Sequence, residues 1–347
     1  MTLDSTRLTF GLWHDFRQAL PHQLPHAEYY EECIEEVRHA EALGYDAVWV
    51  SEHHFVDDGY IPSVLPMLAV LARETTRMTL GSAVVLLPLH HPLRLAEDAA
   101  FVDLVSGGRF ILGVGQGYVF REFQALGVDR RQRPSRMDEG IAIIKQAWET
   151  GRVTFHGKRW NFDDVIVGPR PAQQPRPPIY LGARSEAGYA RVAREADGYL
   201  DPGGPQPAIK ERYAAVTAAR AREGKTMDGF PYVLAFSCFL DEDSDRAWEI
   251  AGPTIAYQWN KYAEWGTDPD GQAAIPVDPT RLVREDFLVG TPEEALEQLK
   301  RIYDESPFTH CCVFGRLPGL THTQALRSLE LFAQRVAAPL RQHAEGR

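Results

Sequence analysis

The stretch LGYDAVWVSEHHF, residues 43–55, contains the end of a helix, a turn and a complete strand. Leu43 ends a run of apolar residues with helical spacing, and Gly44 directly after it is a typical helix C-cap. Ala47–Ser51 is a short apolar run that favours a strand, and the polar residues Glu52-His53-His54 follow at once. A helix, a buried strand and a polar strand end, in this order, are typical of a parallel sheet with its functional groups at one edge.

The same alternation of strand and helix continues along the whole chain. The predicted strands are Leu8–Trp13, Ala47–Ser51, Met78–Leu87, Phe110–Val114, Ile179–Ala183, Gly198–Leu200, Tyr232–Leu240 and His310–Phe314. The predicted helices are Glu28–Leu43, Pro62–Thr75, Pro92–Val105, Ser135–Glu149, Glu186–Ala196, Ala208–Glu223, one that begins at Thr291-Pro292, and Thr321–Ala337. Eight strands and eight principal helices in strict order predict an α/β fold, a (β/α)8 barrel of the TIM type. We expect one domain over residues 1–347.

Two insertions interrupt the alternation. Residues 153–178, after the fourth strand, contain a predicted hairpin and several prolines. Residues 241–289, after the seventh strand, contain a helix near Ser244–Tyr262 and then the Gly/Pro/Asp-rich stretch Gly266–Pro279. A stretch of that composition inside a compact domain predicts a mobile loop or a lid over a site.

The bulk properties restrict the class of partner. The net charge is −11, which argues against nucleic acid or an anionic membrane surface as a partner. The four cysteines have no framework spacing, and the polar N-terminus leads directly into a strand without a visible signal peptide. No apolar run reaches the roughly 18 residues that span a bilayer. We expect a soluble cytoplasmic protein.

Histidines gather at two of the strand ends, where a barrel holds its functional residues. The second and third predicted strands end at His53-His54 and His90-His91, four of the twelve histidines in the chain. Adjacent strand residues point to opposite faces, so His53 and His54 cannot readily bind one ion. The chain also has no His-x-His and no HExxH motif. We therefore expect no metal and assign His53 as a proton donor or acceptor. His54 and His91 can equally be structural groups of the barrel rim.

Aromatic residues indicate where a substrate would lie. Trp13 and His14 end the first strand, and together with His54 they are candidates for a substrate pocket. The second insertion adds aromatic residues, which suggest an apolar or aromatic pocket or, alternatively, ordinary core: Tyr257, Trp259, Tyr262 and Trp265.

Two backbone segments are candidate cofactor sites. Gly113-Val114-Gly115-Gln116-Gly117 follows the fourth strand, and its three positions without Cβ would let a flat ring or a phosphate lie against the chain. This loop is not GxGxxG and can also be a tight barrel turn. Gly182-Ala183-Arg184-Ser185, after the fifth strand, offers amides, a hydroxyl and a guanidinium to an anion. Arg136 is a further anion candidate, although either arginine can instead form a surface ion pair.

Several of these segments resemble the bacterial luciferase-like flavin-dependent monooxygenases. The segments are residues 43–55, Leu80-Gly81-Ser82-Ala83-Val84, His91-Pro92-Leu93-Arg94, Ser106-Gly107-Gly108-Arg109-Phe110 and Gly113–Gly117. The resemblance extends from Leu8 to about Ala196 and resumes over Gly290–Pro339. It implies a (β/α)8 barrel that binds reduced FMN, adds dioxygen to give a flavin C4a-peroxide, and oxygenates a small organic, apolar substrate.

The resemblance also implies roles for individual residues. The first histidine of the EHH strand end is the family's acid/base, which corresponds to His53, and the bulged third strand, often with a non-proline cis bond, corresponds to Ala83-Val84. The residues expected to contact the cofactor are Ala83, Val84, Gly115, Gln116, Gly117, Tyr118, Arg136, Gly182, Ala183, Arg184 and Ser185. Luciferases have a reactive cysteine where Gly115 stands and an acidic residue where Arg184 stands, so these two departures argue against light emission.

Partners and competing functions follow as expectations. The resemblance implies a homodimer, with dioxygen and a small molecule as substrates. The chain has no nicotinamide fingerprint, so reduced FMN would come from a separate NAD(P)H flavin reductase. The strongest competing function is an oxidoreductase that transfers hydride with a deazaflavin coenzyme on the same barrel. A non-catalytic flavin-binding subunit and a metal-dependent barrel hydrolase are two weaker hypotheses.

Overall fold

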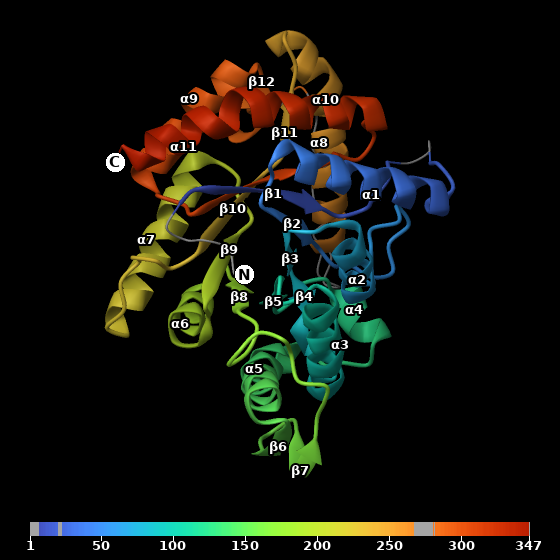
Figure 1. The fold of residues 1–347 in the computed structure, drawn as a ribbon, viewed down its shortest axis with the longest axis vertical. Coiled ribbons are helices and arrows are strands. Elements are labelled where there is room, and N and C mark those ends of the chain that lie inside the picture. Colours follow the sequence, from blue (N-terminus) through green and yellow to red (C-terminus); the bar gives the residue numbers. More distant parts are fainter. Residues whose placement is uncertain (1–6, 20–22, 267–279, 281, 347) are drawn as a thin grey trace.

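The structure, a computed structural model, describes residues 7–19, 23–266, 280 and 282–346. Eight parallel strands form a closed barrel at the centre of the molecule (Figure 1). Around the barrel they are β1 (Thr9–His14), β2 (Ala47–Val50), β3 (Thr79–Ser82), β5 (Phe110–Gly115), β8 (Ile179–Gly182), β9 (Gly198–Asp201), β10 (Tyr232–Phe236) and β13 (His310–Phe314). The ring closes because β1 pairs with β13 and β3 pairs with β5. The predicted barrel is therefore confirmed.

Helices surround the barrel on its outside (Figure 1). They are α1 (His26–Leu43), α2 (Val64–Glu74), α3 (Pro92–Val105), α5 (Arg133–Thr150), α6 (Glu186–Glu195), α7 (Gln206–Arg222), α9 (Pro292–Glu305) and α10 (His322–Phe332). Helix α10 continues through the π-helical turn Ala333–Ala337 into α11 (Ala338–Glu345). Local signals set the helix ends: Gly44 adopts the left-handed C-cap of α1, and Thr291 with Glu294 forms a capping box at α9.

The strands are buried on both faces, which explains their nearly continuous apolar sequences. Inside the barrel, Trp13, Trp49 and Tyr180 belong to a compact cluster of buried side chains. A larger cluster fills the layer between the strands and the helices. Among the described residues, no helix is long and apolar enough to cross a membrane.

Two predicted strands are broken, and both corrections concern mainly apolar runs. The predicted strand Met78–Leu87 divides into β3 and the short β4 (Val85–Leu86), on either side of a cis peptide bond between Ala83 and Val84. That cis bond confirms the expectation from the family resemblance. The predicted strand Tyr232–Leu240 divides into β10 and β11 (Cys238–Leu240). Both halves of each run are buried, so hydrophobicity alone could not reveal the break.

Both insertions emerge from the barrel where predicted. The first contains the antiparallel hairpin β6 (Arg152–His156) and β7 (Asn161–Ile166), which projects at the bottom of Figure 1. The second contains α8 (Ser244–Gly266) and β12 (Leu288–Gly290), and β12 pairs with β11 outside the barrel. Most of the predicted lid, residues 267–279, lies outside the described residues. The remaining short helices are α4 (Phe120–Ala125) and the 3-10 turns Leu87–Leu89, Arg130–Gln132 and Arg284–Asp286.

Candidate functional site

His53 lies just beyond the C-terminal end of β2, where it is buried and paired with Glu122 of α4. His53 Nδ1 and Glu122 Oε1 are 2.9 Å apart, and the same oxygen accepts a hydrogen bond from the backbone N–H of His54. An ionised carboxylate only accepts hydrogen bonds, so this contact places the proton of a neutral His53 ring on Nδ1. Nε2 is then the nitrogen free to accept a proton, and no described residue hydrogen-bonds to it.

Four aromatic side chains surround the His53 ring, and we call them the aromatic shell. They are Tyr60 and Trp265, each with its ring centroid 4.9 Å from that of His53, Tyr118 at 5.7 Å and Tyr262 at 6.0 Å. These residues follow β2 and β5 or belong to the end of α8, so three separate segments build one wall. The shell excludes water from the face of His53 and would favour an apolar ligand there.

Arg17 lies behind the aromatic shell and is fully buried. Its guanidinium carbon is 4.9 Å from the ring centroid of Tyr262 and 5.1 Å from that of Tyr60. Asp15 forms an ion pair with it at 3.1 Å, and Asp58 lies 3.7 Å from its other terminal nitrogen. Burial alone would lower the pKa of Arg17, but Asp15 and other neighbouring acidic groups raise it above its ordinary value. Arg17 is therefore a permanent cation that holds the shell in place.

Glu52, His54 and His90 form a second group on the other side of the strand end, which we call the Glu52 cluster. Glu52 Oε1 is 2.6 Å from His54 Nε2 and 2.8 Å from His90 Nε2, while Oε2 accepts a hydrogen bond from the Leu86 N–H. Burial alone would raise the pKa of Glu52, but His90 and His54 outweigh burial and lower it to about 2. The cluster joins the end of β2 to β4 and to the turn after it.

The glycines after β5 make room for the chain's own third strand. A Cβ on Gly113 would lie 1.8 Å from the Ser82 carbonyl oxygen, and one on Gly115 would lie 2.5 Å from a methyl group of Val84. Gly117 has a positive φ of 70°, which favours glycine. Packing against β3 and Val84 by itself requires glycine at positions 113 and 115, and the contact of this loop with a cofactor stays a prediction.

An anion could bind near the first turn of α6. Arg184 is exposed and makes no ion pair with any described residue. Ser185 is the N-cap of α6, and its Oγ accepts a hydrogen bond from the Gly188 N–H. The other first-turn amides of α6 point outward at the positive end of the helix dipole. Arg136 is less available, because its Nε donates to the Pro88 carbonyl and its guanidinium lies 4.8 Å from the Trp160 ring centroid.

The structure separates Trp13 from His14. Trp13 points into the barrel and stacks on Phe314, whereas His14 points outward and is wholly buried. His14 Nε2 is paired with Glu36, and its Nδ1 accepts a hydrogen bond from the Phe16 N–H. Strand alternation explains the difference. Because both ring nitrogens of His14 are engaged away from the barrel interior, we leave it out of the substrate pocket.

Sequence reasoning missed Glu122, Arg17 and the connecting role of Glu52. Glu122 belongs to a helix of only six residues, whose pattern is too short to mark it as functional. Arg17 follows the first strand by a few residues, so a wider search of the segments after strand ends could have found it. The spacing of Glu52 and His54, two residues apart on one strand end, was the available signal for the Glu52 cluster.

A family model described as luciferase-like monooxygenase matches residues 8–310. An F420-dependent glucose-6-phosphate dehydrogenase from Microbacterium testaceum is 29% identical over 309 residues, covering 83% of this chain and 88% of that protein. The oxygenase component of a flavin-dependent trigonelline monooxygenase from Acinetobacter baylyi is 35% identical over 157 residues, covering 45% of this chain and 43% of that protein. The match covers less than half of this relative's length, and the same holds for one other curated relative.

Solved structures share the fold. A monooxygenase from Streptomyces bottropensis has a TM-score of 0.83 at 24% identity, covering 96% of this chain and 99% of that chain. The oxygenating constituent of 3,6-diketocamphane monooxygenase from Pseudomonas putida, in complex with FMN, has a TM-score of 0.78 at 19% identity and covers 96% and 98%. At such identities the similarity establishes the barrel fold, and it leaves the chemistry open.

Proposed function

We propose, on the premise that this chain belongs to the luciferase-like monooxygenase family, that it uses reduced FMN and dioxygen to oxygenate a small apolar substrate. The family is enzymatic, and the relatives divide between flavin-dependent monooxygenases and F420-dependent enzymes. One observation carries our choice: four aromatic rings surround His53, and such a wall favours an apolar or aromatic substrate.

Residues at the barrel mouth fit FMN. The exposed guanidinium of Arg184 and the first-turn amides of α6 would hold the phosphate, together with Ser185. The Val84 side chain covers Gly115 and lies beside Gly182, so these strand ends present a small apolar surface that would suit a flat ring. Gln116, Gly117 and Tyr118 adjoin this face. Ala83, Ala183 and Arg136 complete the proposed cofactor contacts.

The chain's own groups would control protons and water around the reaction. Bound reduced FMN supplies the two electrons with which dioxygen places one oxygen atom in the substrate and releases the other as water. His53 Nε2 would accept and return a proton at the reacting centre, while Glu122 holds the ring by Nδ1. The aromatic shell would exclude water and thereby limit unproductive release of hydrogen peroxide. Trp13 and His54 are the remaining pocket candidates.

Two partners belong to the same proposal. A separate NAD(P)H flavin reductase would supply reduced FMN, as the name "oxygenase component" implies for the Acinetobacter relative. A homodimer follows from the family resemblance.

A reductase-coupled assay with isotopically labelled dioxygen tests the function. We expect one labelled oxygen atom in the product from at least one member of a panel of apolar ketones, aldehydes and aromatic compounds. His53→Ala should lower kcat by about 10²–10⁴-fold while FMN affinity is kept, because general acid–base catalysis has that magnitude. His156→Ala, on the exposed hairpin strand β6, is the matched control and should leave turnover unchanged. Turnover without dioxygen, or full activity of His53→Ala, would contradict the proposal.

A deazaflavin-dependent dehydrogenase is the second candidate, favoured by the F420-dependent relative that covers 83% of this chain. Equilibrium titration of the purified protein with FMN and with F420 distinguishes the two. Tighter binding of F420, combined with anaerobic hydride transfer to it, would replace the oxygenase proposal.

A further inference from the structure

Two imidazoles and one carboxylate converge on a single point in the Glu52 cluster. One ligand atom each from Glu52, His54 and His90 lies within 4.8 Å of the others. Both histidines direct Nε2 at the same carboxylate oxygen, at 2.6 Å and 2.8 Å. When Nε2 loses its proton, the lone pair points in the same direction as the former N–H bond. Both rings are therefore already oriented toward a shared centre.

Strand geometry explains how the three residues reach one side. Glu52 and His54 are two residues apart in the segment after β2, so they point the same way, whereas His53 between them points toward the aromatic shell. His90 arrives from the turn Leu87–Leu89 that follows β4. The sequence argument against a metal considered His53 with His54 and two local histidine motifs, whereas the tertiary structure groups His54 with Glu52 and the distant His90.

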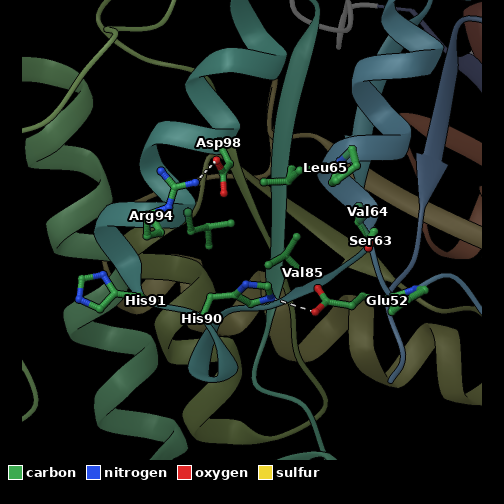
Figure 2. A pocket seen from close by; sticks show the side chains of 12 residues that line it. Glu52, Ser63, Val64, Leu65, Val85, His90, His91, Arg94 and Asp98 are labelled. Carbon is green, nitrogen blue, oxygen red and sulfur yellow. Dashed lines mark hydrogen bonds and ion pairs between the residues drawn. The ribbon is translucent and has the colours of Figure 1, made fainter. Parts of the chain in front are cut away.

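A cavity adjoins the Glu52 cluster. Its volume is about 210 Å³, and its lining includes Glu52, His90, Val85 and the first turns of α2 and α3. Figure 2 shows His90 pointing toward Glu52 across this cavity, while His91 points the other way. Within the Glu52 cluster, His90 is the more accessible histidine, with a third of its side chain exposed. An ion at the cluster would therefore keep coordination positions open to water or a small ligand.

We propose that Glu52, His54 and His90 form a binding site for a divalent transition-metal ion of the zinc type. Two imidazoles and one carboxylate with an open position are the ligand set that zinc takes in sites with three protein ligands. Ligand atoms around tetrahedral zinc are about 3.3 Å apart. The 2.6 Å contact must therefore open by about 0.7 Å and the 2.8 Å contact by about 0.5 Å. Side-chain rotation at the cavity wall can provide that movement. The site lies on the other side of the strand end from the His53 ring. His54 is also a candidate for the substrate pocket, but the zinc measurement does not require oxygenase turnover.

A second group of potential metal ligands differs from the Glu52 cluster in its accessibility and in the charge of its carboxylate. His14, Cys33 and Glu36 also lie within 4.8 Å of one another, but all three are buried. Glu36 is already compensated by Arg316 and His322, so a cation there would meet a neutralised carboxylate. Glu52, in contrast, has only the two imidazoles and one backbone amide as hydrogen-bond partners among the described residues.

Zinc titration of the untagged, chelator-treated full chain tests the proposal. We expect one equivalent of Zn²⁺ to bind, measured by calorimetry and by competition with a chromophoric zinc indicator. His90→Ala should weaken that binding by more than about tenfold, because it removes one of three ligands. His91→Ala is the matched control: it changes the neighbouring residue of the same cavity, whose ring contacts Trp160 instead of Glu52, and it should bind zinc like the wild type.

The wild-type protein alone provides a second measurement in case His90→Ala does not fold. Co²⁺ in place of zinc should give the intense visible absorption bands of a four-coordinate site, and Zn²⁺ should displace them. No stoichiometric zinc binding, equal affinity in folded His90→Ala, or Co²⁺ spectra as weak as those of the aqueous ion would each overturn the proposal.

Discussion

At the residue scale, Glu122 decides which nitrogen of His53 is available. Its Oε1 lies 2.9 Å from His53 Nδ1 and also accepts the His54 N–H, so one carboxylate fixes both the ring and the backbone that carries it. Its other oxygen, Oε2, is buried without a hydrogen-bond partner among the described residues. A carboxylate oxygen that is buried without a hydrogen bond lowers the stability of the fold. Proteins retain such groups where they serve a functional site.

Glu122→Gln tests this positioning role. The amide keeps the size of the side chain but can present a donor to His53, so we expect kcat to fall by at least about tenfold. The melting temperature and the FMN affinity should change little. The pH profile of kcat/KM should change shape, which a purely structural role would not cause. An unchanged profile with normal turnover would show that Glu122 does not position His53.

Gly113 provides a residue-scale test of the barrel wall. A Cβ at this position would lie 1.8 Å from the Ser82 carbonyl oxygen, so Gly113→Ala must displace the backbone of β3 or β5. We expect a loss of at least about 1–3 kcal/mol in the free energy of unfolding, measured with urea. Gly346→Ala at the end of α11 is the control, because its φ is negative and the nearest atoms to its Cβ would be the Gln342 and His343 carbonyl oxygens, at an ordinary 3.6 and 3.7 Å. Equal stability of the two variants would refute this account of Gly113.

At the scale of elements, Glu36 joins α1 to the C-terminal part of the chain. On the buried side of α1 it is 2.9 Å from His322 Nδ1 at the start of α10 and 3.1 Å from His14 Nε2 of β1. Burial alone would raise the pKa of Glu36, but the hydrogen bonds with His14 and His322 outweigh it and lower the pKa. The bond with Glu36 raises the pKa of His322. One buried carboxylate thus links three elements that are far apart in sequence.

The raised pKa of His322 predicts a pH-dependent contribution to stability. Its stabilisation is complete below the unfolded pKa of 6.5 and is lost as the pH rises through the higher folded pKa. His322→Ala should therefore cost about 1–2 kcal/mol at about pH 6 and clearly less at about pH 9. Urea unfolding at both pH values measures the difference, with His156→Ala as a control at an exposed pair. A cost that does not change with pH would contradict the assignment.

At the scale of the whole molecule, barrel closure joins the two ends of the chain. Thr9 of β1 is paired with His310 of β13, so the first and last strands depend on each other. The hairpin β6–β7 pairs only with itself and lies outside this ring (Figure 1). Because neither half of the barrel can bury its strand edges alone, we expect the described strands and helices to unfold as one unit.

Calorimetry tests whether the chain is one domain. We expect a single heat-absorption peak, and the same for a variant in which the hairpin, residues 153–165, is replaced by a short Gly/Ser turn. The replacement should lower the melting temperature slightly, since Trp160 and its contacts with His91 are lost. Two separable peaks in the full chain would show two domains instead.

The sequence by itself determined the alternation of the elements and the main proton-transfer candidate. Some signals act within a few residues and can be recognised in the sequence alone. They are the strand and helix periods, the C-cap at Gly44 and the capping residue Thr291. The family resemblance located the cis bond at Ala83-Val84. His53 was found because barrel geometry directs attention to strand ends.

Only the tertiary structure decided which groups meet. Glu122 is 69 residues from His53 and His90 is 38 residues from Glu52, and no local pattern encodes such contacts. Closure of the strands into a ring also decides three other features. They are the direction of His14, the position of Arg17 behind the aromatic shell, and the strand breaks at Ala83 and Ser237. Closure brings eight distant strand ends to one mouth. The chemistry of the site is therefore a property of the closed barrel, while its parts are properties of the chain.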